Sequence, residues 1–235
     1  MHFNTRREFV KKDRRLQDSD LYEKCFALKE KGSTYRFFAI FLSVVLALFI
    51  FRFYWTNNYG GVLVDGASMC NTLQHGDKLL MRYCDGEDAE RGDVIVVYVE
   101  NIPEIKAENE KKEEGKKTKY LIKRLIAVEG DAVKCTKGQV EIRYAGTEEW
   151  VKLYEPYAYY ENAEIYSFGV YEVGKGEIFF LGDNRNKSKD SRYNQTQGSH
   201  LDRLYKVTDI IGVVPEWAIE HREFIGKYLI HEELS

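Results

Sequence analysis

The sequence has little cysteine, little proline and almost no net charge, and each shortage narrows the class of protein. Its four cysteines, Cys25, Cys70, Cys84 and Cys135, form no CxxC pair, which argues against a structural zinc site or a thioredoxin-like redox motif. Three prolines stand beside 17 tyrosines and 13 phenylalanines, a composition that favours strands over disorder. The net charge of −3 supplies no global field for nucleic acid. We therefore expect one strand-rich domain plus an appendage in these 235 residues, with no nucleic acid partner.

Long apolar runs are scarce too, and the main one lies near the amino terminus. Residues 37–55 read FFAIFLSVVLALFIFRFYW, and as a helix these 19 residues would rise about 28 Å, close to the hydrocarbon thickness of about 30 Å. Basic residues crowd residues 1–36, which predicts a cytoplasmic basic segment, a transmembrane signal anchor at 37–55 and an extracytoplasmic domain at 56–235. The alternatives are a buried core helix and a cleaved signal peptide, but residues 57–61 contain no small-x-small cleavage site. The anchor would also separate Cys25 from the other three cysteines, so we expect no functional disulfide.

After the anchor, short apolar runs alternate with turn signals, which predicts antiparallel β structure rather than βαβ units. We expect strands at residues 62–64, 78–83, 93–99, 120–128, 132–135, 139–142, 178–181 and 210–214. Residues 100–119 hold six acidic and six basic side chains, which predicts a solvated charged hairpin. The tyrosine-rich stretch at about 132–177 predicts a small inserted subdomain with an aromatic core, and residues 216–235 predict a short amphipathic helix.

A candidate nucleophile lies in residues 64–73, where one hydroxyl follows two small residues. Gly66 and Ala67 lead to Ser68, and Met69 and Leu73 follow it, which is how a loop would present a nucleophile against an apolar floor. An ordinary Gly/Ser turn between two strands gives the same pattern. A catalytic role for Ser68 therefore has to be supported by a second functional group from elsewhere in the chain.

Lys123 is the candidate partner because it interrupts the apolar strand at 120–128. With a side-chain period of two it shares a face with Leu121, Leu125 and Ala127, while Arg124 points the other way. Desolvation would lower its pKa from about 10.4 to near 7, at a cost of about 4–5 kcal/mol, and a neutral amine can act as a general base.

Two other readings of these residues stay open. Lys123 can be an edge-strand lysine that only discourages aggregation. A Ser/His/Asp triad is the second alternative, drawing on His75, His200, His221 or His231, because triad members can come from anywhere in a chain.

Residues 182–192 form a third stretch, GDNRNKSKDSR, directly after an apolar run. A calcium loop is excluded because Arg185 and Lys187 would occupy ligand positions counted from Asp183, and a cation cannot ligate a cation. A charged turn without a task does not explain why the cluster follows a buried strand.

In order and spacing, GASM around Ser68, KRLIAVEGD from Lys123 and GDNRNKSKDSR from Gly182 resemble the motifs of type I signal peptidases, in the single-anchor form common in Gram-positive bacteria. The resemblance implies that Ser68 is the nucleophile and Lys123 the base. It implies that Ser188 orients the lysine, and that supporting roles fall to the residues Asp183, Asp190 and Arg192. It further implies a mainly β fold, a large antiparallel barrel-like catalytic domain with an inserted smaller β lid subdomain, resting on the membrane after one transmembrane helix.

The activity implied is that of a membrane-bound serine endopeptidase (a hydrolase) that removes signal peptides after Ala-x-Ala-like sites. Its partners would be secretory preproteins and membrane lipid, with no metal and no cofactor. An extended substrate could add as a strand beside residues 62–66 and 120–122. Gly66, Ala67, Met69 and Leu121 would line the oxyanion and substrate-strand positions.

Two positions depart from the family pattern. Asn71 stands where the family usually has proline, and Gly66 where some members carry a serine that helps stabilise the oxyanion. A catalytically impaired, membrane-anchored binding or assembly protein on the same scaffold is therefore an alternative. A self-cleaving serine/lysine peptidase like the SOS repressors is less consistent with an amino-terminal anchor.

Overall fold

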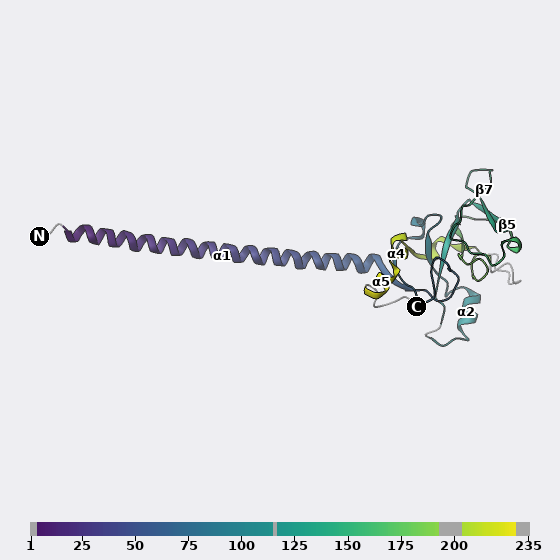
Figure 1. Ribbon diagram of the computed structural model, residues 1–235, viewed down its shortest axis with the longest axis horizontal. Helices are drawn as coiled ribbons and strands as arrows, with labels where there is room; N and C mark the ends of the chain where they lie inside the picture. Colours follow the sequence, from purple (N-terminus) through teal and green to yellow (C-terminus); the bar gives the residue numbers. More distant parts are fainter. Residues whose placement is uncertain (1–3, 115–116, 193–203, 229–235) are drawn as a thin grey trace. The chain divides into compact units, whose positions relative to one another are not determined.

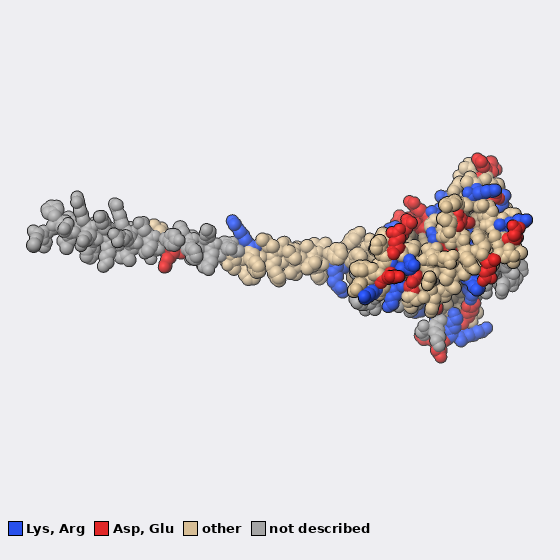
Figure 2. Space-filling view, in the orientation of Figure 1, with Lys and Arg blue, Asp and Glu red and all other residues tan. Residues whose placement is uncertain are grey.

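Helix α1 (Asn4–Asn58) contains the apolar run that the sequence marks as an anchor. An 18-residue window within its segment Thr34–Asn58 has a mean hydropathy of 2.4, and none of the residues in that window is buried. Apolar side chains lie all around it, with Phe49 70% exposed and Leu42 67% exposed. On the face drawn in Figure 2, charged side chains are few along this stretch. By length and composition, the segment can cross a membrane.

The computed structural model describes residues 4–114, 117–192 and 204–228 (Figure 1). The chain divides into two units, Met1–Trp55 and Thr56–Ser235, and the second contains both β-sheets.

The larger sheet is curled into a half-barrel of seven strands. In spatial order the strands are β1 (Tyr59–Leu63), β2 (Lys78–Tyr83), β11 (Ile210–Val214), β3 (Val94–Tyr98), β4 (Tyr120–Val128), β9 (Glu177–Leu181) and β10 (Tyr205–Lys206). Each neighbouring pair is antiparallel, with Ile95 of β3 opposite Lys123 of β4. The predicted antiparallel, barrel-like fold is confirmed.

The smaller sheet has four strands, all from the stretch predicted as an insertion. Their order is β7 (Val151–Lys152), β6 (Gln139–Arg143), β5 (Ala132–Thr136) and β8 (Phe168–Glu172). The aromatic residues here divide in two: Tyr166 and Tyr171 are buried, whereas Tyr154 is 89% exposed. The predicted aromatic core is therefore built from only part of the tyrosine-rich segment.

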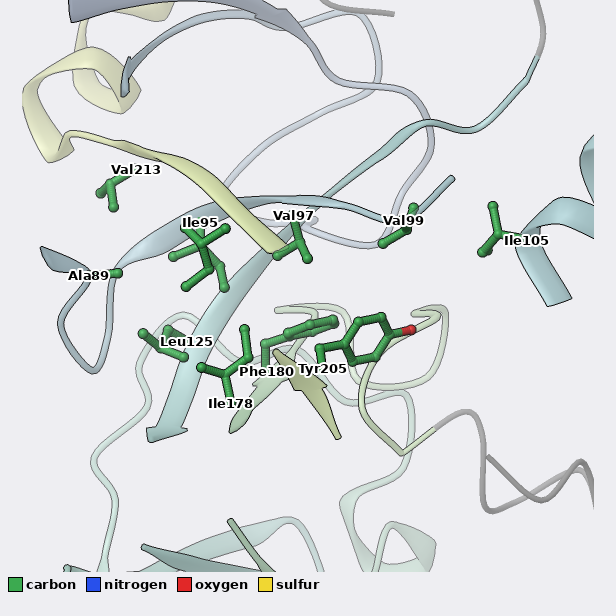
Figure 3. Close-up of a cluster of buried hydrophobic side chains, with 11 residues drawn as sticks. Ala89, Ile95, Val97, Val99, Ile105, Leu125, Ile178, Phe180, Tyr205 and Val213 are labelled. Carbon is green, nitrogen blue, oxygen red and sulfur yellow. The ribbon is translucent and has the colours of Figure 1, made fainter. Parts of the chain in front are cut away.

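Two clusters of buried apolar side chains form the core. In the first, Ile95 and Val97 face Ile178 and Phe180 (Figure 3). The second joins the two sheets and includes side chains of β5, β6 and β9, among them Val133, Ile142 and Phe179.

The strict alternation predicted for β4 fails near its carboxyl end. A register shift between Leu125 and Ala127 places Leu125 in the first cluster and Ala127 in the second. An extra residue in one strand reverses the face of every side chain that follows, so Ala127 does not share the face of Lys123.

The expected hairpin at 100–119 is instead a connection that carries helix α2 (Pro103–Asn109). Pro103 suits the first helical turn, and Ile105 is buried in the first core cluster. The Asn109 amide donates to the Thr118 carbonyl at 2.7 Å and accepts from the Thr118 amide at 2.8 Å. The charged composition of residues 100–119 gave no indication that Ile105 and Asn109 anchor this connection.

The remaining described helices are short. Three are 3₁₀ turns, η1 (Gly86–Asp88), η3 (Ala163–Ile165) and η4 (Val207–Asp209). The predicted terminal helix is two helices, α4 (Glu216–Glu220) and α5 (Arg222–Tyr228), and the rest of that prediction lies outside the described residues.

Candidate active site

The loop at residues 64–77 presents Ser68. Its neck is closed by two backbone hydrogen bonds of 2.9 Å, from the Val64 amide to the Asp77 carbonyl and from the Gly76 amide to the Val64 carbonyl. Met69 and Leu73 are 1% and 0% exposed, so the loop has the apolar floor expected from the sequence. These contacts order the loop although Asn71 replaces the usual proline.

Gly66 forms the turn before the nucleophile. Its φ of +98° is a conformation that side-chain-bearing residues rarely adopt. Its amide donates to His75 Nδ1 at 3.2 Å, which ties the turn to the other side of the loop.

Lys123 meets the serine inside the protein. It is 2% exposed, and its Nζ lies 2.8 Å from Ser68 Oγ and 2.7 Å from the Ile122 carbonyl oxygen. Desolvation lowers the pKa of the amine from 10.5 to about 8, and the carboxylates of Asp190 and Asp183 oppose the shift.

Asp183 holds the loop after β9 against β4. It is fully buried and accepts two hydrogen bonds from the Arg124 guanidinium, at 2.8 and 2.7 Å, and a third from the Thr72 hydroxyl. The backbone N–H of the next residue, Asn184, donates a hydrogen bond to the Ser68 carbonyl oxygen at 3.0 Å. The loop after β9 therefore fixes the backbone of Ser68.

Asp190 and Arg192 close the same loop on itself. Asp190 is fully buried and accepts from the Gly182 amide at 3.2 Å and from the Arg192 guanidinium at 3.0 and 3.1 Å. Arg192 also donates to the Arg185 carbonyl at 3.0 Å. Both residues thus support the strand end from which Asp183 projects.

Ser188 and the backbone of Ser68 both lie close to Gly182. The Oγ of Ser188 is buried and has no hydrogen-bond partner in the part of the chain that the structure describes. A Cβ placed on Gly182 would come within 2.2 Å of that Oγ and 2.5 Å of the Ser68 carbonyl oxygen. Only glycine fits at position 182, because a Cβ there would collide with the Ser188 side chain and the Ser68 backbone.

A buried ion pair that the sequence reading did not single out joins the two sheets. Arg185 is 2% exposed and donates to Glu155 at 2.6 Å, to the Tyr160 hydroxyl at 2.8 Å and to the Gly182 carbonyl at 3.0 Å. Arg185 belongs to the third motif, GDNRNKSKDSR. The sequence around Glu155 gives no sign that this residue is buried in an ion pair, because Arg185 is 30 residues away.

The histidines that are described do not contact the nucleophile. His75 accepts from Gly66, and His221 Nδ1 lies 2.8 Å from the Trp217 carbonyl. His200 and His231 lie outside the described residues. Among the described residues, no group of three or more His, Cys, Asp or Glu side chains could hold a metal ion, and Cys70, Cys84 and Cys135 are free thiols.

A groove with a volume of about 440 Å³ opens beside the serine and the lysine. Residues 62–69 line one part of it and residues 117–123 another, so Gly66, Ala67, Met69 and Leu121 all contribute. Ile105, His75, Lys187 and Lys189 complete the described lining.

A serine hydroxyl bonded to a buried amine at the edge of an open groove defines a serine hydrolase. The family model for signal peptidase, peptidase S26, matches residues 34–225. Signal peptidase I of Bacillus licheniformis is 30% identical over 66% of this chain and 75% of its own length. Signal peptidase I of Bacillus amyloliquefaciens is 30% identical over 71% of this chain and 79% of its own. A crystal structure of a signal peptidase I from Enterococcus faecalis is 22% identical, covers 55% of this chain and 97% of that one, and has a TM-score of 0.37. The chain belongs to the signal peptidase family, peptidase S26, and is a serine peptidase, as its three motifs predict.

Proposed function

We propose that this chain is a membrane-anchored signal peptidase that cleaves secretory preproteins after small-x-small sites, with Ser68 as nucleophile and Lys123 as general base. The observation that carries the proposal is the 2.8 Å contact between Ser68 Oγ and the buried Lys123 Nζ. A lysine whose pKa has fallen to about 8 is about half neutral at pH 8 and can accept a proton there.

The reaction is acyl transfer. Neutral Lys123 accepts the Ser68 proton as Oγ attacks the scissile carbonyl carbon, and the resulting ammonium returns a proton to the leaving amine. An acyl-enzyme remains on Ser68, and the neutral amine then takes a proton from the water that hydrolyses it. The Ser68 backbone N–H stabilises the oxyanion, with more of that task falling to the backbone because Gly66 has no hydroxyl.

Supporting residues hold this geometry. The Asp183–Arg124 pair and the Asn184 amide fix the Ser68 backbone, and Asp190 with Arg192 fixes the strand end behind it. A buried hydroxyl without a partner is costly, which supports Ser188 as the group that orients the lysine amine during the reaction.

The groove accommodates the substrate as an added strand. Residues 62–66 and 120–122 both line it, and main-chain pairing with either segment would bind an extended peptide regardless of most of its side chains. Shallow sites next to Ser68 would accept the small side chains found at the ends of secretory signal peptides.

The anchor sets where the reaction takes place. Residues 37–55, within the apolar helical segment Thr34–Asn58, would span the bilayer with the basic amino terminus in the cytoplasm, leaving residues 56–235 on the outer side. Tethering beside the membrane raises the effective concentration of emerging cleavage sites.

The test is cleavage of a preprotein by the full chain in detergent or lipid. The wild type should cut after an Ala-x-Ala site, and Ser68→Ala and Lys123→Ala should each abolish cleavage, whereas Lys152→Ala on the exposed strand β7 should not. Full activity in both dyad variants would refute the assignment. A wild type that binds preproteins without cutting them would instead support the binding-protein alternative.

A further inference from the structure

The groove has a strongly one-sided distribution of charge. Besides Lys123, four lysines line it: Lys117, Lys119, Lys187 and Lys189. All four come from the β3–β4 connection and the loop after β9. The opposite wall, residues 62–69, contributes a single acidic side chain, Asp65. We call the four lysines the lysine wall.

The ion pairs of these lysines leave them able to exchange partners. Lys187 pairs with Glu161 at 3.1 Å, and both side chains are about half exposed or more, at 64% and 49%. Lys189 pairs with Glu108, again with both partners partly exposed. Lys117 pairs with Glu114, whose side chain is 81% exposed. Lys119 makes no ion pair with a described residue. Exposed pairs contribute little free energy, so a substrate carboxylate can replace these partners at small cost.

The lysine wall is held in place by α2. Ile105 anchors the helix in the core, and Asn109 bonds the Thr118 backbone in both directions. The Lys119 carbonyl accepts from the Val99 amide at 2.8 Å. The positive side chains thus project from a fixed backbone, which favours selection by charge.

We propose that the lysine wall selects substrates with an acidic side chain about four residues from the scissile bond. This proposal rests on the peptidase function above and specifies its substrates. Lys119 precedes Lys123 by four residues and directly precedes strand β4, so the separation is about 13 Å along the groove at about 3.3 Å per residue. An extended substrate covers that distance in the same number of residues.

The side of the scissile bond on which the acidic residue falls depends on the direction of the bound peptide. Antiparallel pairing at each step of the order β1-β2-β11-β3-β4 gives β1 and β4 the same direction, so an added strand is parallel to both or antiparallel to both. The peptide set must therefore carry the charge on either side.

The experiment compares small-x-small peptides with Glu, Gln or Lys about four residues before or after the cleavage site. Binding is measured by fluorescence anisotropy to full-length Ser68→Ala in micelles, and kcat/KM is measured with the wild type. On one side of the site, the Glu peptide should bind about fivefold more tightly than the Gln peptide, which corresponds to about 1 kcal/mol. The preference should disappear at about 1 M salt, where the screening length falls to about 3 Å.

Substitutions in the lysine wall identify the cause. In the Ser68→Ala background, Lys119→Gln should reduce the preference for Glu, and Lys119→Glu should turn it into a preference for the Lys peptide. Lys152→Gln, an exposed lysine of β7 outside the groove, is the matched control and should change nothing.

Two outcomes separate this proposal from the peptidase function. Equal binding of all peptides, or a Glu preference that survives Lys119→Glu, would overturn the proposal even if cleavage is normal. A charge preference in binding without any cleavage by the wild type would uphold it and refute the peptidase function.

Discussion

Replacing Lys123 by methionine should remove activity and yet stabilise the protein at neutral pH. Burial lowers the lysine pKa from 10.5 to about 8, and each unit represents about 1.4 kcal/mol, so holding the charged amine in this site costs about 3 kcal/mol. Methionine fills a similar volume without charge. It loses the hydrogen bonds to Ser68 and Ile122, worth about 1 kcal/mol each. The net gain at pH 7 should be about 1 kcal/mol.

The stability difference between Lys123→Met and the wild type should depend on pH, because the pKa of Lys123 differs between the folded and the unfolded chain. The unfolded chain binds a proton at residue 123 up to pH 10.5, whereas the folded chain releases it above about 8. Wild-type stability should therefore rise between pH 8 and 10.5, and the advantage of Lys123→Met should disappear across that window.

Urea unfolding of the full chain in micelles, followed by circular dichroism at pH 7 and pH 10, measures both quantities. Lys152→Met is the control, because an exposed substitution should shift stability by less than about 0.5 kcal/mol at either pH. A Lys123→Met protein less stable than the wild type at pH 7, or an equal difference at both pH values, would show that the amine is not desolvated.

Two further substitutions test how the nucleophile loop is supported. Asp183→Asn leaves the Arg124 guanidinium without its carboxylate in a buried site and should lower stability by about 3–5 kcal/mol in urea unfolding; a loss below about 1 kcal/mol would contradict the bracing role. Gly182→Ala places a Cβ 2.2 Å from Ser188 Oγ and should reduce kcat/KM at least about a hundredfold by displacing the loop. Gly169→Ala, whose Cβ would meet no atom within 4 Å, should keep wild-type activity, and equal activity of the two variants would refute the argument from crowding.

The central strands could be predicted to the residue where alternation and turn signals agree. The predicted bounds 78–83, 120–128 and 210–214 match β2, β4 and β11. Strands β7 and β10 have two residues each, too few for any periodicity, and β8 contains a glycine and exposed positions that obscure its pattern. Helix α2 depends on the burial of one isoleucine within a charged segment, which only the tertiary structure provides.

In the site, too, the features that could be predicted are those with a local sequence pattern, and those that depend on tertiary contacts could not be. The contact between Ser68 and Lys123 could be anticipated because each residue breaks a local pattern, a hydroxyl after two small residues and a charge inside an apolar strand; their catalytic roles stay predictions. Glu155 could not be found because its pairing with Arg185 depends on how the second sheet packs on the first. The role of Ser188, which came from the family resemblance, stays a prediction.

The pH dependence of kcat/KM tests the central claim most directly, since the proposed mechanism requires the neutral form of the Lys123 amine. For a neutral peptide substrate, log kcat/KM should rise with unit slope at low pH and level off above the lysine pKa of about 8. A profile that is flat from pH 6 to about 10, or whose bend persists in Lys123→Ala at wild-type rates, would contradict the account.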